Sequence, residues 1–150
     1  MADVMNEATR HRVMANIGSK NTLPEILVRS FLHRVGFRFR LHVSSLPGTP
    51  DIVLKRFNTV VFINGCFWHG HQSCKYSRLP STRTDWWKQK INNTVKRDAD
   101  YIEKLRADSW NVIVIWTCAI NKTKSLNRIA ELPNIISGQA TKKSQLVDIG

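Results

Sequence analysis

The chain has 150 residues, and its 23 Lys and Arg residues outnumber its 11 Asp and Glu residues, which gives a formal net charge of +12 at pH 7. This length suits a single domain, 1–150, and no stretch approaches the ~20 apolar residues that cross a bilayer. Because the charge favours nucleic acid as the partner and neither a signal peptide nor a lipidation motif is evident, we expect a cytoplasmic protein with no membrane partner.

The N-terminal segment 1–20 is basic and has no clean apolar period; its cations include Arg10, Arg12 and Lys20. Such a segment buries too little apolar surface to order by itself. We therefore expect a basic N-terminal arm that orders on contact with its partner.

The first predicted helix lies in "NTLPEILVRSFLHRVGF" and ends at Gly36. Thr22 suits the N-cap, Pro24 is tolerated in the first turn, and Glu25 completes a capping box. The capping box explains Glu25 without a functional role, although the first turn of a helix can also face a cleft. The apolar face that we expect to be buried holds Leu27, Phe31 and Val35.

Short strands follow this helix. Strict alternation of apolar and polar residues in "FRFRLHV", 37–43, predicts a half-buried strand. After the turn "SSLPGTP", the runs "DIVLKRF", 51–57, and "NTVVFIN", 58–64, predict adjacent antiparallel strands.

The long segment 84–108, "TDWWKQKINNTVKRDADYIEKLRAD", predicts a second helix. Its expected inner face includes a carboxylate, and its members are Trp87, Ile91, Val95, Asp98, Ile102 and Leu105. Because a buried carboxylate needs a partner, we expect Asp98 to pair with a histidine of the preceding loop.

The remaining elements complete an α/β domain. The run "WNVIVIW", 110–116, is continuously apolar, as in a central strand buried on both faces. A last helix through Ile129 and Leu132 is expected to stop at Pro133, and 137–150 is expected to be a flexible tail. The predicted fold is a mixed central sheet flanked by helices.

Cysteine and histidine residues crowd the stretch "FINGCFWHGHQSC", 62–74. An odd number of cysteines in a reducing compartment argues against a disulfide framework. Three thiols and one imidazole suit tetrahedral zinc, and the set uses every cysteine of the chain: Cys66, His71, Cys74 and Cys118. Inert buried cysteines are the alternative.

Asp51 follows a proline turn in "LPGTPDIVL" and begins a strand. A carboxylate there can project into a cleft and bind Mg²⁺, although Pro-Asp is also ordinary turn chemistry. The next antiparallel strand brings Ile63 and Asn64 beside Asp51, with His69 a few residues further on. A carboxylate-bound metal with an imidazole general base is what phosphodiester hydrolysis requires.

Aromatic residues gather around the same stretch: Phe67, Trp68, Trp86 and Trp87. In a basic protein such side chains can stack on bases or wedge between base steps. Core packing is the alternative, and it is the stronger reading for Trp87, which falls on the apolar face of the long helix.

Motifs along residues 5–120 also occur in one particular order: "TRHRVMANIGSKNTLPEILVR", "LPGTPDIVL", "FINGCFWHGHQSC", "STRTDWW" and "VIVIWTCA". In this order they resemble the very short patch repair (Vsr) endonucleases, which nick DNA at T:G mismatches. The "GCFWH" run is the most specific part of the match. The resemblance implies a restriction-endonuclease-like fold.

The resemblance also implies roles for the matching positions. Asp51 is expected to be the principal Mg²⁺ ligand, helped by the backbone carbonyl of Ile63. His69 is expected to act on the attacking water, with Glu25 as a supporting acidic residue. The family's structural zinc ligands match Cys66, His71, Cys74 and Cys118. The aromatics that enter the DNA stack beside the mismatch match Phe67, Trp68 and Trp87, and the basic arm is expected to close over the duplex.

The chain departs from the family pattern in two places. The family's well-known member has a histidine where this chain has Asn64, and asparagine cannot take a proton at neutral pH, although it can hydrogen-bond water. The loop between His71 and Cys74 is one residue longer, which shifts the third zinc ligand.

We therefore expect a Mg²⁺-dependent, strand-specific DNA endonuclease, acting as a monomer, that cuts double-stranded DNA beside the thymine of a T:G mismatch. A wobble pair unstacks more easily than a matched pair, so insertion of aromatic side chains selects it. Two alternatives stay open: a related nuclease of the restriction or homing type that cuts matched DNA, and a zinc-stabilised nucleic-acid-binding module without catalysis.

Overall fold

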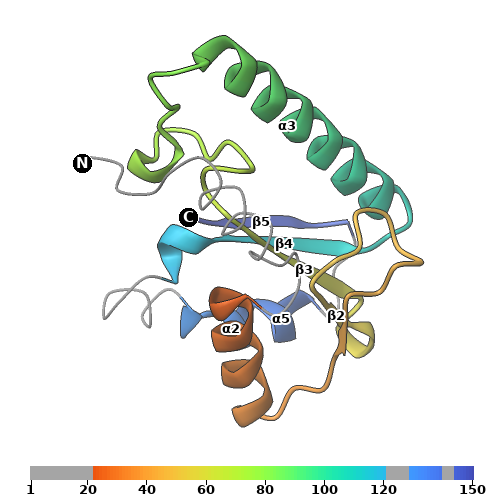
Figure 1. Cartoon of the computed structure of the whole chain (residues 1–150). Coiled ribbons are helices and arrows are strands. Elements are labelled where there is room, and N and C mark those ends of the chain that lie inside the picture. The colour runs from red at the N-terminus through yellow and green to blue at the C-terminus, as the bar shows by residue number, and fades with distance from the viewer. Residues whose placement is uncertain (1–21, 121–128, 140–143) are drawn as a thin grey trace.

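The computed structural model describes residues 22–120, 129–139 and 144–150. Outside the described residues lies the predicted basic arm with Arg10, Arg12 and Lys20. The described part forms a five-stranded sheet with three α-helices (Figure 1). In chain order the elements are α2 (Leu23–Arg34), β1 (Arg40–Leu41), β2 (Ile52–Leu54), β3 (Thr59–Asn64), α3 (Thr84–Ala107), β4 (Asn111–Trp116), α5 (Leu132–Gln139) and β5 (Leu146–Ile149).

The sheet is mixed, with the strand order β1-β2-β3-β4-β5. β1 and β2 pair antiparallel, as do β2 and β3, whereas β3, β4 and β5 run parallel. The predicted antiparallel pair is therefore confirmed. So is the predicted central strand, because β4 lies between two partners and is buried from Asn111 to Ile115.

Helices cover both faces of the sheet (Figure 1). On one face α3 packs through Leu105 against a cluster that includes Val112. On the other face α2 and α5 pack through Leu32 and Leu132 against the second cluster. The α/β class, with a mixed sheet flanked by helices, is thus confirmed. In the described ranges no helix is long and apolar enough to span a membrane.

The buried face of α2 differs from the predicted one. Leu27 and Val35 are each 47% exposed, and only Phe31 of the predicted face packs against the core; the buried residues of this helix are Glu25, Val28 and Leu32. Apolar spacing alone misses this face because one of its members is a carboxylate.

The predicted strand at 37–43 is much shorter in the structure, where only Arg40–Leu41 pair with β2. His42 has a φ of +49°, a left-handed conformation that ends the extended strand. Its backbone N–H still donates to the carbonyl oxygen of Asp51 at 3.2 Å, so these two residues lie side by side.

The predicted end of the chain is wrong in two respects. α5 begins at Leu132 and continues past Pro133. The N–H groups of the first helical turn have no partner within the helix, so a proline there costs no helical hydrogen bond. Within the expected tail 137–150, α5 extends to Gln139 and β5 pairs along β4. Val147 and Ile149 of β5 pack against the core and stabilise this last strand.

Candidate functional site

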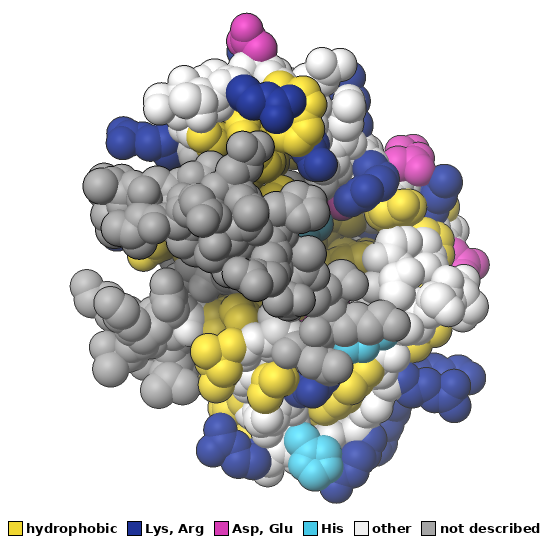
Figure 2. Space-filling model, in the orientation of Figure 1, with side chains coloured by type: hydrophobic (Ala, Val, Ile, Leu, Met, Phe, Trp, Pro, Cys, Tyr) yellow, Lys and Arg dark blue, Asp and Glu magenta, His cyan; other side chains and the backbone are white. Residues whose placement is uncertain are grey.

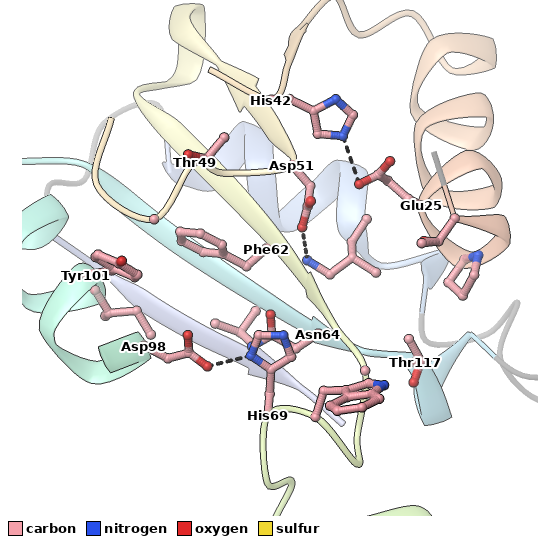
Figure 3. A pocket seen from close by; sticks show the side chains of 18 of the residues that line it. Glu25, His42, Thr49, Asp51, Phe62, Asn64, His69, Asp98, Tyr101 and Thr117 are labelled. Atoms are coloured by element: carbon pink, nitrogen blue, oxygen red, sulfur yellow. Dashed lines mark hydrogen bonds and ion pairs between the residues drawn. The ribbon is translucent and has the colours of Figure 1, made fainter. Parts of the chain in front are cut away.

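A cleft of about 770 Å³ lies between the start of α2, the segment before β2, the end of β3 and the middle of α3. Figure 3 shows that Glu25, His42 and Asp51 point toward one another on one side of this cleft. His69 and Asp98 lie together on the other side. The fold therefore gathers carboxylates and imidazoles from separate segments into one cavity.

Asp51 immediately precedes β2, and its carboxylate lies against the end of β3. Its Oδ2 accepts a hydrogen bond from the backbone N–H of Ile63 at 2.7 Å. Burial and a hydrogen bond with Glu25 raise the pKa of Asp51 to about 8, although the Ile63 N–H acts to lower it. Two neighbouring carboxyl groups that are shielded from water repel each other when both are ionised, so a bound cation would stabilise their ionised forms.

Glu25, in the first turn of α2, faces this cleft. The Glu25 side chain is 2% exposed, and its Oε1 lies 3.0 Å from Nε2 of His42. The side chain of Thr22 makes no capping hydrogen bond, so that half of the predicted capping box is wrong.

His42 is a cleft residue that the sequence analysis did not identify. Strand pairing carries the signal that could have found it, because Arg40 lies opposite Val53 and Leu41 lies opposite Ile52. One further step along this hairpin places His42 opposite Asp51.

His69 lies on the loop after β3, and its Nδ1 is 2.5 Å from Oδ2 of Asp98 on α3. This contact confirms the predicted pairing of Asp98 with a histidine of the loop. Asn64, at the end of β3, is 8% exposed and lines the same cleft. The loop histidine is thus held by a helix, and the asparagine lies near it on a strand.

The predicted zinc ligands converge beside this cleft, and their ligand atoms all lie within 4.8 Å of one another: Cys66, His71, Cys74 and Cys118. The Sγ of Cys118, after β4, is 3.5 Å from Nδ1 of His71. The hydroxyl of Ser77 donates to the carbonyl oxygens of His71 and Cys74, at 2.6 and 2.8 Å. The longer loop therefore still brings its cysteine into the group.

The closeness of these thiols changes their ionisation. Burial and a hydrogen bond with Cys66 raise the pKa of Cys118 to about 12. Burial also acts to raise the pKa of Cys66, but hydrogen bonds with Thr117, Cys118 and Cys74 outweigh it and lower that pKa. Because neighbouring thiolates repel one another, the donor set fits a metal ion that would hold them together.

Aromatic rings form a cluster next to the cleft. Phe67, Trp68 and Trp87 contact one another edge to face, with ring centroids 5.1, 5.3 and 5.8 Å apart. Trp86 extends the cluster at 4.8 Å from Trp87 and is 43% exposed. Trp68 is 37% exposed and also lines the cleft. The cluster is thus not wholly buried, because it presents Trp68 at the cleft and exposes Trp86 beside it.

Cations lie beside one of these rings. Figure 2 shows Lys and Arg side chains at several places on the described surface of the visible face. The charged groups of Arg83 and Lys90 lie 4.6 and 5.0 Å from the ring centroid of Trp86. Cations beside exposed rings suit contact with both the phosphates and the bases of a nucleic acid.

Comparison with known proteins points to one family. The family model described as "DNA mismatch endonuclease Vsr" matches residues 2–75. The chain is 44% identical over 136 residues to "Type II nicking enzyme V.XorIIP" of Xanthomonas oryzae pv. oryzae; the matched region covers 91% of this chain and 98% of that relative. It is 40% identical over 126 residues to "DNA mismatch endonuclease Vsr" of Escherichia coli, and that matched region covers 84% of this chain and 80% of the relative. The chain therefore belongs to the Vsr family of DNA endonucleases.

Proposed function

We propose that this chain nicks one strand of double-stranded DNA beside the thymine of a T:G mismatch, with Mg²⁺ as the catalytic cofactor. The observation that carries the proposal is the convergence of Asp51 and the His69–Asp98 pair on one cleft that the exposed ring of Trp68 also lines. The names of the relatives support it, since one is called a mismatch endonuclease and another a nicking enzyme.

Asp51 and the backbone carbonyl of Ile63 would hold the Mg²⁺ ion. In an extended strand the N–H and C=O of one residue face the same edge, and the N–H of Ile63 points to Asp51. The carbonyl oxygen of Ile63 therefore faces Asp51 as well, and oxygen ligands are those that Mg²⁺ prefers. When bound, Mg²⁺ neutralises developing charge at the scissile phosphate.

His69 takes a proton from the water that attacks the phosphate. Asp98 contacts Nδ1 of His69, which leaves Nε2 as the nitrogen for this transfer. Asn64 lines the same cleft and orients the water by a hydrogen bond, since an amide cannot take its proton. Glu25 supports the site as a second carboxylate beside Asp51.

DNA contacts come from the aromatic cluster and the basic arm. Phe67, Trp68 and Trp87 enter the base stack beside the mismatch, where unstacking requires less free energy than at a matched pair. The arm contacts phosphates through Arg10, Arg12 and Lys20. One chain acts on one duplex, as a monomer.

A structural Zn²⁺ ion would be held by Cys66, His71, Cys74 and Cys118. These four protein ligands complete a tetrahedral site and leave no position for a reacting water. The ligands flank His69 in the chain, so the ion keeps the catalytic loop in place. This role is structural rather than catalytic.

A nicking assay on matched and mismatched duplexes of one sequence tests the proposal. In Mg²⁺, we expect the T:G duplex to be nicked at least roughly tenfold faster than the T:A duplex. Asp51→Asn should slow nicking by about 1000-fold, because a lost metal ligand removes several kcal/mol of transition-state stabilisation. His33→Gln, at an exposed position of α2, is the matched control and should retain the rate.

Equal nicking of both duplexes would favour a nuclease for matched DNA. Tight DNA binding without any nicking would instead support the non-catalytic binding module and refute the proposed mechanism.

A further inference from the structure

The cleft contains a nitrogen donor that the proposed Mg²⁺ site does not use. A carboxylate oxygen of Glu25, a ring nitrogen of His42 and a carboxylate oxygen of Asp51 all lie within 4.8 Å of one another. They come from α2, from the residue after β1 and from the residue before β2 (Figure 3). Three separate segments thus bring one imidazole and two carboxyl groups together.

This group is well shielded from solvent. The side chains of Glu25 and His42 are 2% and 12% exposed, and the carboxyl groups of Glu25 and Asp51 are hydrogen-bonded to each other. Nη1 of Arg29 forms an ion pair with Oε2 of Glu25 at 3.9 Å. Shielded carboxyl groups in contact require a proton or a cation between them, because two adjacent negative charges repel each other.

The spacing of the donors matches that around one metal ion. Two ligand atoms that are each about 2.1 Å from an octahedral ion lie about 3 Å apart when adjacent and about 4.2 Å apart when opposite. Nε2 of His42 is 3.0 Å from Oε1 of Glu25. The whole set, within 4.8 Å, needs only small side-chain movements to close on one ion.

The chemistry of the donors selects among cations. Carboxylates accept Mg²⁺, Ca²⁺ and Mn²⁺ alike, whereas imidazole nitrogen binds first-row transition metals and is a poor ligand for Mg²⁺ and Ca²⁺. A site with two carboxylates and one imidazole therefore favours a transition-metal ion over Mg²⁺.

We propose that Glu25, His42 and Asp51 together bind one divalent cation, with Nε2 of His42 as a direct ligand, so that this cleft binds a first-row transition-metal ion such as Mn²⁺ more tightly than Mg²⁺. The inference rests on the proposed function, because Asp51 is a ligand in both the catalytic metal site and this cation site.

Electron spin echo envelope modulation of Mn²⁺ tests the proposal, since it detects imidazole nitrogen bound to the ion. With the zinc-loaded full chain and MnCl₂, we expect nitrogen modulation in the wild type and its loss in His42→Gln. The modulation should persist in His69→Gln, which removes the other cleft imidazole, and in His33→Gln, the exposed control on α2. Titrations should show that His42→Gln raises the Kd for Mn²⁺ by about tenfold or more while the Kd for Mg²⁺ changes less than about twofold.

Modulation that survives in His42→Gln would overturn the proposal. Equal increases in both Kd values would also overturn it, because His42 would then only position Glu25. The result is separable from the nicking assay: a chain that nicks T:G duplexes in Mg²⁺ but shows no nitrogen modulation keeps its proposed function and loses this site. A chain that shows the nitrogen modulation but does not nick T:G duplexes keeps this cation site and loses its proposed function.

Discussion

The raised pKa of Asp51 couples the stability of the metal-free protein to pH. This pKa is about 8 in the folded chain against an ordinary value of 3.8. Between these values the unfolded chain has lost a proton that the folded chain still holds. Unfolding therefore releases a proton in this window, and the free energy of unfolding falls as pH rises from about 4 to about 8.

Asp51→Asn should remove this dependence, because asparagine does not titrate. In Mg²⁺-free buffer we expect the variant to be more stable than the wild type by on the order of 2 kcal/mol at pH 8 and nearly equal to it at pH 4, after allowance for solvent screening. Urea denaturation at both pH values measures the difference. Asp100→Asn, at an exposed position of α3, is the control and should show no such trend. A stability difference that stays constant with pH would contradict the coupling.

Individual cleft residues were predictable to different degrees. Asp51 stands at the start of an apolar run and Asp98 on the apolar face of a helix, so the burial of each carboxylate could be expected from the pattern. His42 could not, because it reaches Glu25 only through a left-handed backbone that ends the strand early. A periodic pattern contains no information about such a local break.

At the scale of elements, the loop after β3 is fitted closely against α3. Gly70 has a φ of +64°, and a Cβ placed there would lie 2.8 Å from Cγ2 of Ile91 and 2.9 Å from Cγ2 of Val95. The loop that carries His69 therefore packs on the helix that carries Asp98 at a position where only glycine fits.

Gly70→Ala should therefore destabilise the protein, by about 2 kcal/mol, through backbone strain and overpacking. Gly138→Ala is the matched control, since that glycine lies within α5 with nothing within 4 Å of an added Cβ. The control should stabilise by about 0.5 to 1 kcal/mol, because alanine favours helix. Urea midpoints of the two variants measure both effects, and an unchanged midpoint for Gly70→Ala would disprove the close fit.

The long elements α3 and β4 were predicted, because their apolar patterns extend over many residues. β4 is buried along its apolar run, and α3 buries Ile91 and Leu105 of its predicted inner face, although Val95 of that face is 39% exposed. β5 has four residues with alternating exposure, which are too few for a distinct pattern. The strand forms by pairing in parallel with β4. Its formation depends on a neighbour distant in the chain rather than on local sequence.

At the scale of the whole molecule, the cysteine and histidine cluster links segments far apart in the chain. Cys66 and Cys118 follow β3 and β4, and the 66–74 loop supplies the other ligands.

Metal analysis after dialysis should find about one zinc per chain. Cys74→Ser should lose this zinc and lower the Tm by roughly 10 °C, because binding free energy at a structural site is folding free energy.

Gln72→Ala, an exposed change in the same loop, is the control and should keep both zinc and Tm. Folded wild-type protein without zinc would refute the metal site, whatever the Tm of the variants.

The α/β class followed from the order of elements along the chain, but the positions of the helices over the sheet did not. β3, α3 and β4 form one parallel crossover, and β4, α5 and β5 form the next. Both crossovers step in the same direction across the sheet, yet α3 and α5 cover opposite faces (Figure 1).

Two crossovers with this arrangement have opposite handedness, so one of them has the rare left-handed form. A second crossover of the same hand as the first would bring α5 to the face that α3 already covers. The chain instead sets α5 beside α2, where Leu132 and Ile136 complete the core under the other face. A topology built from the handedness rule alone would place α5 on the wrong side of the sheet and leave the α2 face partly open to water.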